Sequence, residues 1–139
     1  MTRPDPYRLE VDSGQDALAE IEHLLARVWS AHPHIPEMVR TQIAIATGEI
    51  GANILEHAGA GKILRVAMEI TVLANEVWVE FTDNGGPFHL DLNAVSLPDD
   101  MAERGRGLPL AKAVLDRLIY ERDALNHWTL VSKRFEPVI

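Results

Sequence analysis

The sequence contains no cysteine, which excludes disulfide bonds and thiolate chemistry. It also has no apolar run near the roughly 18 residues that a membrane-spanning helix needs. The first ten residues, MTRPDPYRLE, lack the apolar region of a signal peptide. From these three absences we expect a cytoplasmic protein that does not contact a membrane.

Basic residues are scarce as well, because 13 Lys and Arg stand against 21 Asp and Glu. The resulting formal net charge of −8 argues against direct binding of nucleic acid or of an anionic membrane. Any anionic ligand must therefore be attracted by local features of its site.

Three common site motifs are also absent. The chain has no G-x-x-x-x-G-K-[ST] segment, so it lacks a Walker-type phosphate loop. The segment GRGLPL, 105–110, lacks the third glycine of a Rossmann motif and follows a loop rather than a strand. The six histidines show no H-E-x-x-H or other tight spacing, so we do not expect zinc.

The hydrophobic pattern predicts a single domain, 1–139, of mixed secondary structure. Helical periodicity predicts helices over 12–30, 36–58 and 108–120, and alternation predicts strands over 7–11, 62–72, 76–84 and 127–135. Ser13 is expected to cap the first helix, whose buried face we assign to Leu18, Ile21, Leu25 and Val28. This order predicts an α+β two-layer sandwich, with a mixed, mostly antiparallel sheet covered on one face by about three helices.

Three polar clusters are candidates for a functional site. The first is the stripe Glu49, Asn53 and His57 on the second helix, where Gly48 and Gly51 interrupt good helix formers. The others are TDNGGPF after a strand and ERGRGLPLAKA before a helix. Taken singly, each has an ordinary explanation: a solvated helix face, a turn, and a loose loop.

Together, the clusters suit an adenine nucleotide. Backbone N–H groups of GRG, 105–107, followed by a helix start at Leu108, would form an anion-binding nest. Asp83 at the end of a buried strand offers an acceptor to the amine of adenine, where guanine has a carbonyl. Asn53 offers a neutral oxygen to Mg²⁺, and glycines beside Glu49 would let backbone or ligand approach the helix.

This set of motifs, in this order, resembles the Bergerat-fold ATPases, and most closely the short anti-sigma-factor serine kinases of the partner-switching type. GEIGANILEHA is similar to the N box, DNGGPF to the G1 box and RGRGLPLAKAVLD to the G2 box, and the match spans roughly residues 8 to 135. The resemblance implies ATP and Mg²⁺ as cofactors. It makes Glu49 the catalytic base and Asn53 the Mg²⁺ ligand. It implies nucleotide contacts for Asn53, Asp83, Gly85, Arg104, Gly105, Arg106, Gly107, Leu108 and Thr129, with a lid over 91–104.

The resemblance also implies a function. The protein would phosphorylate a serine of a small anti-sigma-factor antagonist, and it would bind a sigma factor when that antagonist is not available. It would act as a homodimer. The alternative is a catalytically silent binding module that sequesters a sigma factor or antagonist without phosphoryl transfer. Glu49 at the base position favours the enzyme, because a binding module has no need of a general base.

Overall fold

The computed structural model describes residues 3–13, 16–57, 63–88 and 107–137. Five strands form one sheet in the order β1-β2-β3-β5-β4, and every neighbouring pair is antiparallel. The strands are β1 (Tyr7–Asp12), β2 (Arg65–Val72), β3 (Val77–Asp83), β4 (Arg117–Arg122) and β5 (Asn126–Val131). The described sheet therefore has no parallel pair, although the sequence pattern predicts a mixed one.

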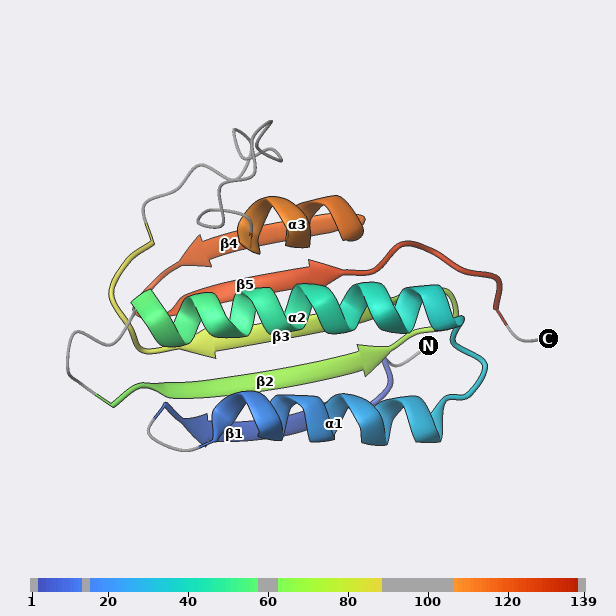
Figure 1. Cartoon of the computed structure of the whole chain (residues 1–139), viewed down its shortest axis with the longest axis horizontal. Coiled ribbons are helices and arrows are strands. Elements are labelled where there is room, and N and C mark those ends of the chain that lie inside the picture. The colour runs from blue at the N-terminus through green and yellow to red at the C-terminus, as the bar shows by residue number, and fades with distance from the viewer. Residues whose placement is uncertain (1–2, 14–15, 58–62, 89–106, 138–139) are drawn as a thin grey trace.

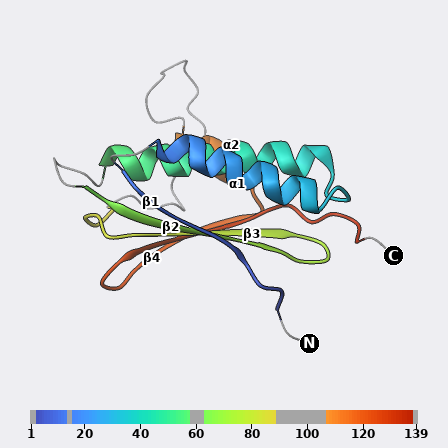
Figure 2. The same ribbon diagram turned by 90° about the horizontal axis from the view of Figure 1, so that it is seen from below.

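Three helices lie on one face of this sheet: α1 (Ala17–Ala31), α2 (Glu37–His57) and α3 (Gly107–Val114). Figure 1 shows α2 between α1 and α3, and Figure 2 shows the helices as one layer above the strands. The predicted α+β two-layer sandwich is confirmed. Among the described helices, none combines the length and the apolar character that crossing a bilayer requires.

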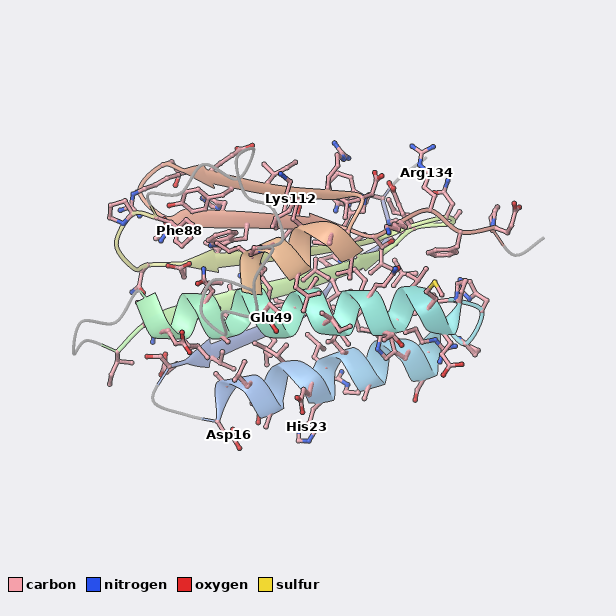
Figure 3. The ribbon with its side chains drawn as sticks, turned by 45° about the horizontal axis from the view of Figure 1, so that its top comes forward. Asp16, His23, Glu49, Phe88, Lys112 and Arg134 are labelled. Atoms are coloured by element: carbon pink, nitrogen blue, oxygen red, sulfur yellow. The ribbon has the colours of Figure 1, made fainter. Side chains whose placement is uncertain are left out.

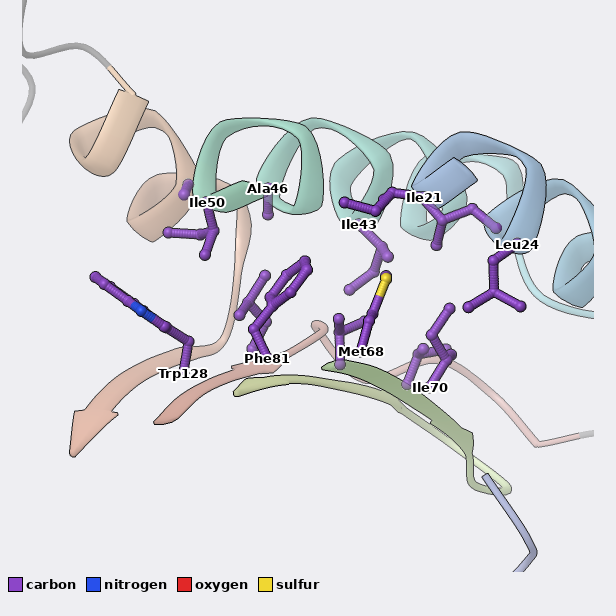
Figure 4. Close-up of a cluster of buried hydrophobic side chains, with 14 of the residues drawn as sticks. Ile21, Leu24, Ile43, Ala46, Ile50, Met68, Ile70, Phe81 and Trp128 are labelled. Atoms are coloured by element: carbon purple, nitrogen blue, oxygen red, sulfur yellow. The ribbon is translucent and has the colours of Figure 1, made fainter. Parts of the chain in front are cut away.

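The core lies between the two layers. Alternate residues of the central strands, among them Met68, Phe81 and Trp128, point toward α2 and are almost completely buried. On the other side of the core, helix α2 contributes Ile43 and Ile50, which are fully buried and lie at helical spacing (Figure 4). Burial of one such side chain stabilises the fold by roughly 1.5–3 kcal/mol. This packing holds one side of α2 on the sheet.

The start of α1 differs from the prediction. Asp16 is the residue before the helix and makes no side-chain capping hydrogen bond. Ser13 instead extends the pairing of β1 with β2: its N–H donates to Leu64 O (2.9 Å), and its Oγ accepts from Leu64 N (2.8 Å). The expectation that Ser13 caps the helix is wrong. Leu18 is 40% exposed and Leu24 belongs to the core in its place.

The largest difference from the prediction is β4. The predicted helix over 108–120 ends at Val114, and the strand β4 follows from Arg117. β4 pairs with β5 so that Leu118 lies opposite Leu130, and Tyr120 opposite Trp128. Pairing with a distant strand overrides the local helical pattern, and it adds a fifth strand at the edge of the sheet.

The C-terminal stretch after β5 is held at the end of the sheet where β2 turns into β3. Ser132 N donates to Val77 O (2.9 Å), and Ser132 Oγ accepts from Val77 N (2.9 Å). Phe135 N donates to Asn75 O in the turn (2.9 Å). These bonds fix residues 132–135 at the end of the sheet opposite Asp83, the last residue of β3.

Candidate nucleotide site

The predicted site elements converge at one end of the molecule. Figure 1 shows the end of β3, the start of β5, the C-terminal end of α2 and the start of α3 on the same side. The first two carry Asp83 and Asn126, and α3 begins at Gly107. The fold therefore brings motifs from distant parts of the sequence to one end of the two layers.

Asp83 ends β3 on the inner face of the sheet, and it is 2% exposed. Its Oδ1 accepts hydrogen bonds from Gly85 N (2.8 Å) and from Asn126 Nδ2 (2.9 Å). Among the described residues, Oδ2 accepts no hydrogen bond. The carboxylate is thus held from one side, and its second oxygen is left for a donor from a ligand.

Asn126 is a buried residue that the sequence analysis did not single out. Its Nδ2 also donates to Gly86 O (2.8 Å). Its Oδ1 accepts from Arg122 Nη1 (2.7 Å) and from the Tyr120 hydroxyl. Arg122 Nη1 donates further to Gly85 O (3.1 Å). Asn126 therefore joins Asp83, the turn after it, and β4.

An aromatic cluster supports this network from the side of β4. The Phe88 ring meets Trp128 with centroids 5.1 Å apart and Tyr120 with centroids 5.7 Å apart, both near edge-to-face. The Phe88 N–H donates to the Tyr120 hydroxyl (2.9 Å). The Tyr120 hydroxyl thus receives one hydrogen bond and donates another to Asn126, so that the end of DNGGPF is tied to the same network.

Glu49 lies where α2 meets the start of α3 (Figure 3). A Cβ placed on Gly107 would stand 2.8 Å from Glu49 Oε2, closer than real Cβ contacts come. Gly107 therefore leaves room for the Glu49 carboxylate beside the first turn of α3. Leu108, the next residue, is buried and joins the core. The structure brings together the predicted base and one predicted phosphate-binding glycine.

Asn53 follows Glu49 by one helical turn on α2, and its Nδ2 is buried without a hydrogen-bond partner among the described residues. A buried polar atom without a partner costs about 1–3 kcal/mol. A ligand that supplies an acceptor would remove this cost, and the amide could also turn its oxygen toward a cation. The residue thus fits a phosphate group with bound Mg²⁺.

The cavity that Asp83 lines does not reach these helices. It has a volume of about 500 Å³, and its walls come from β1, β2 and β3, from Asn84 after β3, and from Leu125 in the turn between β4 and β5. No residue of α2 or α3 lines it. Asp83 lines this cavity, but Asn53 and Gly107 do not.

The predicted site residue Thr129 does not lie beside Asp83. The pairing of β5 with β3 places Asn126 opposite Asp83, whereas Thr129 lies opposite Glu80. Side chains alternate along a strand, so Thr129 faces the other side of the sheet. Asn126, and not Thr129, is the residue of β5 beside Asp83, and a contact of Thr129 with the nucleotide stays a prediction. Gly105, Arg106 and the whole lid segment, 91–104, lie outside the described residues, as does the side chain of His57.

The two glycines of α2 have different surroundings. A Cβ on Gly51 would stand 3.3 Å from Ile21 Cδ1 and 3.5 Å from Leu18 Cδ2, so Gly51 admits helix α1. A Cβ on Gly48 would have no described atom within 4 Å. Close approach at Gly51 is therefore a matter of helix packing.

The antiparallel sheet with helices on one face, a buried aspartate ending β3, and the pair Glu49 and Asn53 on α2 define an ATP-binding fold of the Bergerat class. A family model for the histidine kinase-like ATPase domain matches residues 11–133. The chain therefore belongs to the histidine kinase-like ATPase domain family. A search of curated proteins found no match to the chain. Family membership implies binding and use of ATP.

Proposed function

We propose that the protein is an ATP-dependent serine kinase that phosphorylates a small anti-sigma-factor antagonist. It would bind a sigma factor when the antagonist is absent, and it would work as a homodimer. The observation that carries the kinase is the Glu49 carboxylate, which lies beside Gly107 at the start of α3 and one helical turn before Asn53.

In this proposal, Asp83 recognises the base. Its Oδ1 is occupied by Gly85 N and Asn126 Nδ2, and Oδ2 would accept the exocyclic amine of adenine. Guanine presents a carbonyl at the same place, which a carboxylate repels. The site would therefore bind ATP in preference to GTP.

Glu49 would accept the proton of the attacking serine hydroxyl. Phosphoryl transfer depends on positioning and on charge stabilisation more than on covalent help from the protein. Gly107 leaves room for the carboxylate where α2 and α3 meet, which is the place the proposal gives to the phosphates. Asn53 would hold Mg²⁺, which, when bound, neutralises charge on the phosphates.

A second candidate is a silent binding module that exchanges partners without phosphoryl transfer. The cavity lined by Asp83 favours it, because no residue of α2 or α3 contributes to that cavity. The two functions are separated by turnover. Both allow nucleotide binding, but only the kinase transfers phosphate.

The deciding experiment uses γ-labelled ATP, Mg²⁺ and the antagonist isolated with this chain by affinity capture. We expect labelled phosphoserine on the antagonist, and loss of label with Glu49→Gln. The matched control is Glu37→Gln, because Glu37 is exposed in the first turn of the same helix. A wild-type protein that binds ATP and its partner but transfers no phosphate would establish the binding module.

Nucleotide binding is tested separately by thermal unfolding. Ligand at 100 times its dissociation constant should stabilise the fold by about 2.7 kcal/mol. We expect this shift with Mg-ADP and not with Mg-GDP, and we expect its loss in Asp83→Asn, because the amide offers a donor where the amine needs an acceptor. A shift of equal size with both nucleotides would contradict the role of Asp83.

A further inference from the structure

We propose that Asn126 is the positioning residue that makes the site specific for a 6-aminopurine. It holds Asp83 in one orientation and thereby presents Oδ2 as a fixed acceptor. This inference rests on the nucleotide binding in the proposed function, and it adds a residue outside the three sequence motifs. It acts through Asp83 and does not itself touch the nucleotide.

The orientation of the Asn126 amide follows from its neighbours. The atom that contacts Arg122 Nη1 at 2.7 Å must be the oxygen, because a guanidinium has no acceptor. The other atom is then the nitrogen, which lies 2.9 Å from Asp83 Oδ1 and 2.8 Å from Gly86 O. Both of those atoms are acceptors. The network therefore admits only one orientation of the amide.

This orientation determines what Asp83 can do. Oδ1 accepts from both Asn126 Nδ2 and Gly85 N, so turning the carboxylate would break two hydrogen bonds in a buried setting. Oδ2 remains the oxygen that is available to a ligand. An acceptor held in this way forms a hydrogen bond with a ligand that carries an amine, which raises its affinity. A ligand without the amine gains no affinity from this oxygen.

The Tyr120 hydroxyl supports the same arrangement from β4. It donates to Asn126 Oδ1 and accepts from Phe88 N (2.9 Å). Its ring packs on Trp128, with centroids 4.7 Å apart. Tyr120→Phe would remove the hydroxyl and keep the ring. This variant therefore loosens Asn126 without opening the aromatic cluster.

The experiment is a coupling cycle between Asn126 and the 6-amino group of the nucleotide. Calorimetry with Mg²⁺ measures the affinity for ADP and for purine riboside diphosphate, which lacks that amine. In the wild type we expect ADP to bind about 10- to 100-fold more tightly, the range for a hydrogen bond to a charged group. In Asn126→Asp, which keeps the shape but sets a carboxylate oxygen against Asp83 Oδ1 in place of the donor, we expect the preference to fall to about threefold or less.

Glu121→Gln is the matched control, because Glu121 is exposed on β4 and lies opposite His127 on the other face of the sheet. It should keep the full preference for ADP. Tyr120→Phe should lower the preference part of the way, and it decides the matter if Asn126→Asp fails to fold. If Asn126 serves only the stability of the fold, its substitution would lower the affinities for both nucleotides by the same factor. The ratio of the two affinities would then stay unchanged.

The outcomes separate the two proposals. A wild-type ratio that persists in Asn126→Asp, or in Tyr120→Phe if the first variant does not fold, overturns the role of Asn126 and leaves the kinase standing. A wild-type protein that binds neither nucleotide overturns the nucleotide site itself, and both proposals with it.

Discussion

Substitution of Gly107 by alanine separates the placement of Glu49 from the stability of the fold. The new Cβ would stand 2.8 Å from Glu49 Oε2, whereas ordinary contacts begin at 3.4 Å, so the carboxylate must move. Moving the end of a flexible side chain costs about 0.5–1.5 kcal/mol. Alanine offsets part of this cost, by less than the about 1 kcal/mol that it gains over glycine inside a helix, because Gly107 is the first residue of α3. We therefore expect the free energy of unfolding to change by less than about 1 kcal/mol.

Catalysis should respond far more strongly to the same change. A reacting group that is misplaced by about 1 Å can lose about 100-fold in rate. Gly107→Ala should therefore lower the rate of phosphoryl transfer to the antagonist by about two orders of magnitude, while thermal unfolding stays near the wild-type value.

The control variant is Ala113→Gly, at an exposed position of α3. It should cost about 1 kcal/mol of stability and leave the transfer rate near that of the wild type. A Gly107→Ala protein that transfers phosphate at the wild-type rate would refute the reasoning, because it would show that the contact between Glu49 and Gly107 does not matter to the reaction.

Three further predictions concern stability. Gly48→Ala should raise the free energy of unfolding by about 1 kcal/mol, because the new Cβ meets no described atom within 4 Å. Gly51→Ala should gain less or lose stability, because its Cβ would lie 3.3 Å from a side-chain carbon of α1; equal gains in denaturant unfolding would contradict this packing. Burial, and secondarily His34, lower the pKa of His32 from its ordinary value of 6.5. The unfolded chain therefore takes up that proton more readily, and stability should fall as the pH drops below 6.5. His32→Asn should flatten this fall, measured by denaturation above and below pH 6.5 beside His23→Asn; an unchanged slope would count against it.

Local sequence patterns predicted the architecture where one face of an element is buried throughout. Alternation around Met68 and Phe81 indicated two paired strands, and the spacing of Ile43 and Ile50 indicated the central helix. The pattern misled us after Val114, because Leu115, Leu118 and Ile119 fit a helix as well as a strand. Pairing with β5 decides between the two, and that pairing is not encoded locally.

The site, like the fold, could be predicted only where a local motif marks its residues. Motifs within single elements identified Glu49, Asn53 and Asp83 as candidate site residues. The structure places Glu49 beside Gly107. Asn126 escaped notice because a lone amide at the start of a strand has no local signature. Its role depends on lying opposite Asp83, and a shift of one residue in register would turn it to the other face.

The hydrogen bonds of Ser132 and Phe135 to the turn between β2 and β3 have a practical consequence for handling the protein. The last described residues leave the molecule at the end away from Asp83 (Figure 1), and β1 begins at that end too, because Tyr7 lies opposite Ile70. A label or tether attached at either extremity would therefore project away from the proposed nucleotide. Sensor-chip measurements with immobilised protein should leave the proposed binding end open to solution.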